Sequence, residues 1–200
     1  ASIPHVTHFE EIDISIIEEQ RSELNKTSET KLTPLSYLVM KVISALQEFP
    51  QFNAALVGEG EIMLRKYFNI GIAVDTKDGL LVPVIKDADK LNITEVANEI
   101  IMLAEKAKNK KLLEKNLSGG TFSISSLGPM GGVGFTPIIN PPEVAILGVS
   151  RAKKVPVLEE DKLVEKTILP VALSYDHRVI NGADAGKFMN FLKSEIEKGI

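Results

Sequence analysis

The chain has 200 residues, of which 44% are hydrophobic and 25% charged, a balance typical of a globular protein with one sizeable domain. Its net charge of -4 and pI near 5.5 argue against a protein that binds nucleic acid or anionic membranes. The absence of cysteine excludes a disulfide scaffold, thiolate zinc sites and cysteine nucleophiles. It fits a cytoplasmic protein, or one of the mitochondrial matrix in a eukaryote.

No apolar stretch is long enough to span a bilayer, and no signal-peptide pattern opens the chain. The chain begins at Ala1 rather than at a methionine, which we interpret as a sign of a trimmed fragment of a longer protein. The basic runs at residues 106–111 and 151–154 are interpreted as solvated faces. Attraction of an anionic ligand is the minor alternative.

In the first half of the chain, β-rich runs alternate with two predicted helices. A strand over residues 6–14 precedes a helix over residues 16–24. A second helix has Thr33 as N-cap and Pro34 in its first turn, and it ends before Pro50. Further strands are predicted over residues 62–66, 70–74 and 80–85, the last two joined by an Asp78-Gly79 hairpin turn.

In the second half, Asn92 and Glu95 form a capping box that opens a third helix. The predicted buried stripe of this helix is Ile93, Val96, Ala97, Ile100, Ile101 and Ala104. Strands follow at residues 121–125, 144–149 and 167–173, and the last two runs are typical of strands buried on both faces. A final helix follows Gly182. This mixture, without regular βαβ alternation, predicts an α+β fold with a layer of helices on a mixed sheet.

Two loops carry recognisable patterns. The glycine-rich residues 127–134 match neither a phosphate-binding loop nor a dinucleotide fingerprint, so we interpret them as a loop that closely approaches another backbone or a ligand. The turn Asn140-Pro141-Pro142 delivers the chain into the strand from Val144.

The chain has three histidines, and His177 stands where a strand ends. An imidazole there can take a proton from a thiol or hydroxyl and return it, although a satisfied structural histidine is the equal alternative. His5 and His8 are three residues apart on a strand and face opposite ways, so a metal site is not expected. The serines of residues 123–126 lack the pattern of a nucleophile elbow, which leaves an oxyanion donor or a strand-end cap.

Longer motifs are spread over nearly the whole chain: Ile3-Pro4-His5-Val6-Thr7, Asn69-Ile70-Gly71-Ile72-Ala73-Val74-Asp75-Thr76, Gly79-Leu80-Leu81-Val82-Pro83-Val84-Ile85, Gly119-Gly120-Thr121-Phe122-Ser123-Ile124-Ser125, Phe135-Thr136-Pro137-Ile138-Ile139-Asn140-Pro141-Pro142-Glu143 and Asp176-His177-Arg178-x-x-Asn181-Gly182. In this order they resemble the catalytic core of the dihydrolipoamide acyltransferase component of 2-oxo acid dehydrogenase complexes. The resemblance implies a chloramphenicol-acetyltransferase-like two-layer sandwich, a mixed sheet covered by helices. It also implies homotrimers that assemble into a larger cage.

The implied reaction moves an acyl group from S-acyldihydrolipoyl lysine to coenzyme A, and the two substrates enter a tunnel between subunits from opposite ends. By this resemblance, His177 is the general base on the thiol, Ser125 of the adjoining subunit donates to the oxyanion, and Asn181 organises the site. The tunnel is lined by Phe135, Thr136, Pro137 and Ile138. No metal and no tightly bound cofactor is implied, because coenzyme A and the lipoyl group, carried on a separate domain, are substrates.

The chain departs from the family pattern in two ways. The signature most often has aspartate at the position of Asn181, and an amide can hold a hydrogen-bond network without supplying charge. An arginine-rich helix usually precedes the segment that matches Ile3, and it is missing here, as are the lipoyl and peripheral-subunit-binding domains. We therefore interpret residues 1–200 as an N-terminally truncated acyltransferase catalytic domain.

The partners implied are a lipoyl domain and, through the missing domains, the decarboxylase and dihydrolipoamide dehydrogenase components. Acetyl, succinyl and branched-chain acyl groups fit the motifs equally. Two other functions remain open: a non-catalytic assembly core of such a complex, and a free-standing coenzyme A-dependent O-acyltransferase.

Overall fold

A mixed sheet forms the centre of the computed structural model, which describes residues 3–58, 60–130 and 132–199. Its strands run in the order β1 (His5–Asp13), β11 (Lys162–Asp176), β9 (Ala145–Val149), β8 (Phe122–Ser126), β4 (Ile70–Ile72) and β7 (Val84–Ile85). β8 is parallel to both of its neighbours, and the other pairs are antiparallel. β10 (Lys153–Glu159) pairs with the first half of β11.

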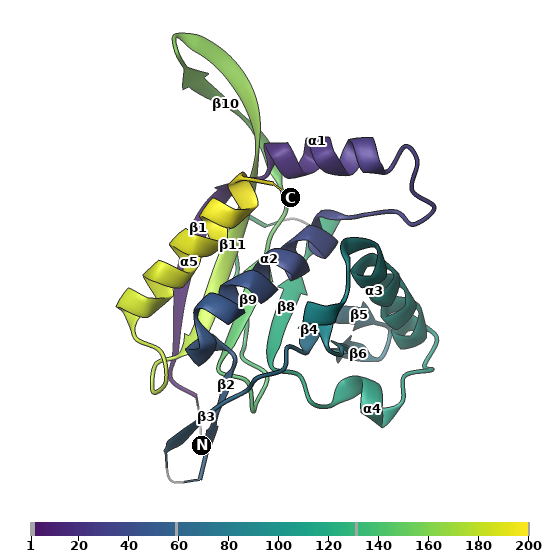
Figure 1. Cartoon of the computed structure of the whole chain (residues 1–200), viewed down its shortest axis with the longest axis vertical. Helices are drawn as coiled ribbons and strands as arrows, with labels where there is room; N and C mark the ends of the chain where they lie inside the picture. The colour runs from purple at the N-terminus through teal and green to yellow at the C-terminus, as the bar shows by residue number, and fades with distance from the viewer. Residues whose placement is uncertain (1–2, 59, 131, 200) are drawn as a thin grey trace.

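Helices cover one face of this sheet (Figure 1). α2 (Pro34–Glu48) and α5 (Gly182–Glu197) lie across this face, α1 (Ser15–Leu24) lies at one end, and α3 (Ile93–Lys108) and the short α4 (Glu114–Leu117) lie toward the β7 edge. Short 3-10 turns occur at Pro50–Phe52, Ala88–Lys90 and Gly128–Met130. The core lies between helices and sheet, where the rings of Phe52 and Phe188 stack with centroids 4.2 Å apart. The predicted α+β layer of helices on a mixed sheet is confirmed.

The predicted helix starts are confirmed where side chains cap them. Asn92 Oδ1 accepts from the backbone N–H groups of Thr94 and Glu95 at 3.0 Å each, and Glu95 Oε2 accepts from Asn92 N–H at 2.8 Å. The predicted stripe of α3 is wrong at one position: Ile101 is 40% exposed, whereas Leu103 and Ala107 are buried. The helix is rotated about its axis relative to the predicted orientation, because its last two turns pack against the core through Leu103 and Ala107.

Two small hairpins flank the sheet: β2 (Ala54–Val57) with β3 (Glu61–Leu64), and β5 (Val74–Thr76) with β6 (Gly79–Leu81). The second confirms the Asp78-Gly79 turn, where Gly79 has a φ of 117°. The strand predicted over residues 70–74 is two strands, because the chain leaves the sheet after Ala73, whose N–H donates to Ile124 O. The run at residues 80–85 is likewise divided between β6 and β7.

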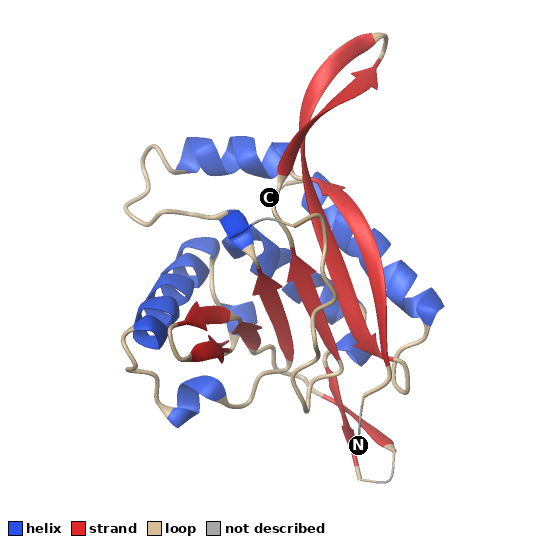
Figure 2. Ribbon diagram, turned by 180° about the vertical axis from the view of Figure 1, so that it is seen from behind, coloured by secondary structure: helices blue, strands red, loops and turns tan. Residues whose placement is uncertain are grey.

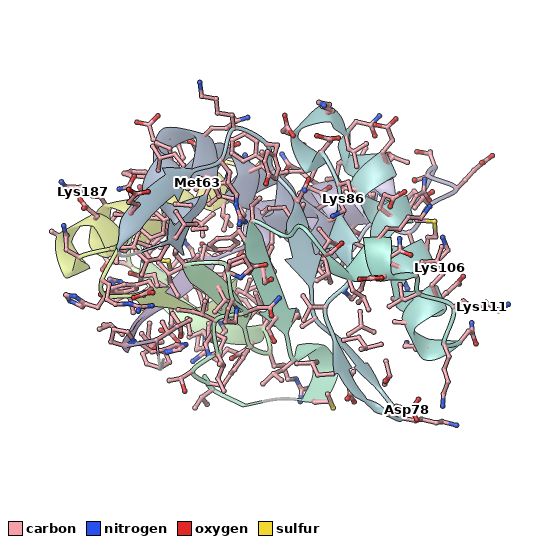
Figure 3. All side chains as sticks on the ribbon, turned by 90° about the horizontal axis from the view of Figure 1, so that it is seen from below. Met63, Asp78, Lys86, Lys106, Lys111 and Lys187 are labelled. Carbon is pink, nitrogen blue, oxygen red and sulfur yellow. The ribbon has the colours of Figure 1, made fainter. Side chains whose placement is uncertain are left out.

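Sequence reasoning missed β2, β10, the first half of β11 and α4. The hairpin of β10 and β11 projects from one end of the molecule and the β2–β3 hairpin from the other (Figures 1 and 2). The basic run at residues 106–111 lies at the solvated edge, where Figure 3 labels Lys106 and Lys111, and Lys110 pairs with Asp78 at 2.8 Å. In the part of the chain that is described, no helix has the length and apolarity needed to cross a membrane.

Candidate active site

The face of the sheet without helices carries a cavity of about 470 Å³. Side chains alternate along β8: Phe122 and Ile124 enter the helix-covered core, while Ser123 and Ser125 line the cavity. The other lining residues come from β9, the β5–β6 region and the segment before β9: Ala73, Leu80, Val82, Phe135, Thr136, Pro137, Ile138, Ile139, Asn140 and Ile146. The structure therefore brings Ser125 together with the predicted lining segment Phe135 to Ile138.

The segment before β9 crosses the strands on the face that Figure 2 turns to the viewer. Gly148 lets it lie against the sheet, because a methyl group there would be 2.9 Å from Phe135 Cζ and 3.1 Å from Pro137 Cδ. His5 fixes the other side, since its Nδ1 donates to Ile3 O at 2.8 Å and its Nε2 accepts from Ile139 N–H at 3.0 Å. His5 thus has the structural role expected of it.

His177 stands at the end of β11, in a main chain that is fixed on both sides. Its N–H donates to Pro4 O at 3.0 Å. The preceding Asp176 is only 2% exposed, and its carboxylate accepts from the Arg178 guanidinium, with Nε to Oδ1 at 2.9 Å and Nη2 to Oδ2 at 2.6 Å, and from the Arg178 backbone N–H at 3.0 Å. The imidazole itself is exposed, and the described part of the chain offers it no hydrogen-bond partner. It is therefore free to meet a ligand or a second copy of the chain.

The charge of Asp176 is set by two opposing effects. Burial raises the pKa of its carboxyl, but hydrogen bonds and the positive charge of Arg178 outweigh burial, and the pKa lies below its usual value. The backbone carbonyl of Asp176 also accepts from Val179 and Ile180 N–H, both at 3.0 Å. These contacts close a tight turn around His177.

Asn181 caps α5 directly after this turn. Its Oδ1 accepts from Asp184 N–H at 2.9 Å, and its Nδ2 donates to Asp184 Oδ2 at 2.8 Å. An aspartate here could accept but not donate, and would place two carboxylates side by side. The amide therefore suits this chain, where position 184 is itself acidic.

One chain does not bring Ser125 and His177 together. Ser125 pairs with Gly148 and Gly148 with Ala172, so these residues form one row across the sheet. His177 lies five positions after Ala172, directly beyond the end of β11. At about 3.3 Å per residue and about 4.8 Å per strand spacing, this register corresponds to a separation of roughly 20 Å between the two Cα atoms. A site that uses both must combine two copies of the chain.

Glu143, which sequence reasoning did not single out, lies beside Ser123, one of the residues that line the cavity. It follows the turn at Pro141 and Pro142, whose peptide bond is cis, and is only 3% exposed. Burial raises the pKa of its carboxyl to about 7, although the nearby Ser123 hydroxyl and the Arg65 charge partly oppose the rise. The sequence signal was a charged residue placed directly before a wholly apolar strand.

Glu143 also lines a second cavity, of about 280 Å³, together with Asp176, Arg178 and residues of the β2–β3 hairpin. The β2–β3 hairpin, which carries the exposed Met63, lies toward the viewer in Figure 3. Among the described residues, no group of His, Cys, Asp and Glu side chains is placed to hold a metal ion.

Comparison with known proteins agrees with this geometry. Residues 1–199 match the family model described as "2-oxoacid dehydrogenases acyltransferase (catalytic domain)". The acetyltransferase component of the pyruvate dehydrogenase complex of Cupriavidus necator is 48% identical over 192 residues, which are 94% of this chain and 34% of that protein. The chain spans about a third to a half of the length of such curated relatives.

Two solved structures superpose with TM-scores of 0.94, each covering 98% of this chain and 82% of the other. One, 45% identical, belongs to a crystallographic and enzymatic study of a serine, a histidine and an asparagine in the catalytic mechanism of Azotobacter vinelandii dihydrolipoamide acetyltransferase. The other, 46% identical, is the cubic core of a pyruvate dehydrogenase multienzyme complex.

Chloramphenicol acetyltransferase, 15% identical, shares the fold alone, with a TM-score of 0.63 over 98% of this chain and 88% of that one. The expected chloramphenicol-acetyltransferase-like fold is therefore confirmed. The chain belongs to the family of 2-oxoacid dehydrogenase acyltransferase catalytic domains.

Proposed function

We propose that this domain transfers an acetyl group from an S-acetyldihydrolipoyl arm to coenzyme A, as the core of a pyruvate dehydrogenase complex. The choice of acetyl among the three acyl groups rests on the curated relatives, which are named as acetyltransferase components of that complex. The cavity beside Ser125 supports acyl transfer, because its volume and mostly apolar lining suit a slender acyl-carrying arm.

The residues named for the A. vinelandii enzyme support the same site. There the serine precedes the histidine by 52 positions and the histidine precedes the asparagine by 4, the same intervals as Ser125, His177 and Asn181 here. This coincidence of three residue types at two intervals is the observation that carries the proposal. In this chain Asn181 acts on the site by capping α5.

In the proposed reaction, the His177 imidazole takes the proton from the thiol of coenzyme A, and the sulfur attacks the carbonyl carbon of the acetyl thioester. The carbonyl oxygen becomes an oxyanion, to which the Ser125 hydroxyl donates. As the carbon–oxygen double bond re-forms, the dihydrolipoyl sulfur leaves as a thiolate and takes the proton from His177. The products are acetyl-coenzyme A and a dihydrolipoyl thiol, and the imidazole is neutral again.

We propose that the site is completed between two copies of the chain in a homotrimer. The separation of roughly 20 Å between Ser125 and His177 in one chain supports this, since neither can reach a substrate held by the other. Trimers would join into a larger cage, as the cubic core of the related complex suggests. Coenzyme A and the lipoyl arm would enter the seam from opposite ends.

The remaining partners follow from this role. The lipoyl group would be carried on a separate lipoyl domain, and the decarboxylase and dihydrolipoamide dehydrogenase would bind through other domains of a longer protein. We place the protein in the cytoplasm, as is usual for a bacterial complex of this kind. No tightly bound cofactor is needed, because both thiols are substrates.

The test is turnover of dihydrolipoamide with acetyl-, succinyl- and branched-chain acyl-coenzyme A, compared between the unaltered domain, His177→Ala and His8→Ala. We expect acetyl-coenzyme A to be the best donor, with most turnover lost in His177→Ala and kept in His8→Ala. An assembled domain without turnover would instead be an assembly core. Transfer to small hydroxyl compounds but not to dihydrolipoamide would identify an O-acyltransferase.

A further inference from the structure

Three buried polar atoms without a hydrogen-bond partner of normal geometry gather around one carboxyl group. They are Glu143 Oε2, Ser123 Oγ and Arg65 Nε, out of five such side-chain atoms among the described residues. Buried polar groups are nearly always satisfied, so a cluster of exceptions calls for an explanation. Because one of the three belongs to Glu143 and the other two lie on its neighbours, the explanation concerns this carboxyl.

The sequence reserves space for this cluster. A methyl group on Gly120 would lie 2.6 Å from Glu143 Oε1, and one on Gly71 would lie 2.5 Å from Ser123 Oγ. Any larger residue at either position would displace a polar group. The backbone of β4 and the start of β8 are therefore shaped around the carboxyl and the hydroxyl.

The cluster lies between the two cavities. Ser123 lines the cavity of Ser125, two positions away on the same face of β8, while Glu143 lines the second cavity. The positively charged Arg65 faces Glu143, but its Nη1 donates to Gly120 O at 2.8 Å. No ion pair reaches Glu143 from any described residue.

The other charged groups nearby are engaged elsewhere. Across the second cavity, Asp176 and Arg178 pair with each other. Lys86 lies beyond Gly119 and donates to Ser118 O. Among the described groups, the Ser123 hydroxyl is therefore the neighbour most directly affected when Glu143 gains or loses a proton.

We propose that Glu143 is a positioning residue for acyl transfer, acting through Ser123 on the serine side of the cavity. This inference rests on the proposed function. A neutral carboxyl donates its O–H to Ser123 Oγ, so the serine proton points into the cavity beside Ser125. A carboxylate can only accept, and it turns the Ser123 hydroxyl away from the cavity. Because burial raises the pKa of Glu143 to about 7, both forms occur near neutral pH.

The first experiment compares kcat and KM for coenzyme A, from about pH 6 to about pH 9, in the unaltered domain and three variants. In the unaltered domain we expect kcat to carry a decline above neutral pH that is absent in Glu143→Gln, whose amide always donates. Ser123→Ala should lose about tenfold in kcat and lose this decline, with KM nearly unchanged. The matched control is Glu160→Gln on the exposed hairpin tip, which should copy the unaltered profile.

Infrared difference spectra between the unaltered domain and Glu143→Gln give a readout that does not depend on turnover. We expect a protonated carboxyl band that disappears near pH 7 and shifts in Ser123→Ala. An active domain whose pH profile is unchanged in Glu143→Gln and Ser123→Ala would overturn the positioning role alone. A domain with the band but no turnover would overturn the proposed function and, with it, this role.

Discussion

Replacing Glu143 by glutamine should change how the stability of the domain depends on pH. The folded-state pKa of this carboxyl is about 7, against an ordinary value of 4.5. Below pH 4.5 the carboxyl is mostly protonated in both the folded and unfolded states, so its ionisation does not make the free energy of unfolding depend on pH. Between these values the unfolded chain releases the proton while the folded chain keeps it, so the free energy of unfolding falls as pH rises.

The expected size of the effect follows from the two pKa values. At about 1.36 kcal/mol per pKa unit, the rise from 4.5 to about 7 corresponds to a loss of about 3 kcal/mol, complete just above neutral pH. The carboxyl is only 3% exposed, so solvent screening does not reduce this figure much. Glutamine has a similar shape and no charge, and it should abolish this pH dependence.

The assay is urea unfolding of the unaltered domain and Glu143→Gln at about pH 5, 6, 7 and 8. Protein concentration is held constant, because assembly also contributes to apparent stability. Between pH 5 and pH 8 the stability of the variant relative to the unaltered domain should rise by about 2.5 kcal/mol, while Glu160→Gln should follow the unaltered domain. A difference between the two proteins that stays constant with pH would refute the reasoning.

Three further substitutions test the site. Ser125→Ala should lower kcat by about a hundred- to a thousandfold with little change in KM for coenzyme A, and a change in KM alone would contradict the oxyanion role. Arg178→Met should leave the Asp176 carboxylate buried without its ion pair and lower the free energy of unfolding in urea by about 2 kcal/mol. The loss is at the low end for a buried pair because the arginine is 41% exposed. Adding Asp176→Asn should restore part of this stability. Gly148→Ala should force Phe135 off the sheet, with a loss of about 1–3 kcal/mol and a raised KM for coenzyme A.

Helices were predicted well from the sequence because their signals are local. Asn92 and Glu95, three residues apart, cap α3 by hydrogen bonds to each other's backbone N–H groups. Pro34 favours the start of α2 because its ring fixes the backbone in a helical conformation. The missed hairpin of β10 and β11 had no such signal. Residues 153–166 project into solvent and bury little, so their pattern shows no apolar face, and only cross-strand pairing makes them strands.

The motifs implied both the chemistry of the site and its place between two subunits, but only through their resemblance to a known family. His177 and Ser125 were identified from their places at strand ends and from the motifs around them. Their separation within one chain depends on the register of three strands, which no local pattern encodes. Glu143 was missed because a carboxylate beside prolines is typical of an exposed turn, and the apolar strand that follows it was a weak local sign of its burial. Its burial depends on glycines far away in the sequence, at positions 71 and 120.

The most direct test of a site shared between two chains is turnover of mixed trimers. His177→Ala and Ser125→Ala subunits, each nearly inactive alone, are unfolded together and refolded, or co-expressed with different tags. A mixed trimer has one seam where an intact histidine meets an intact serine, so random mixing should restore about a quarter of the unaltered turnover. Turnover that stays at the level of the separate variants, with mixed trimers demonstrated, would contradict the shared site.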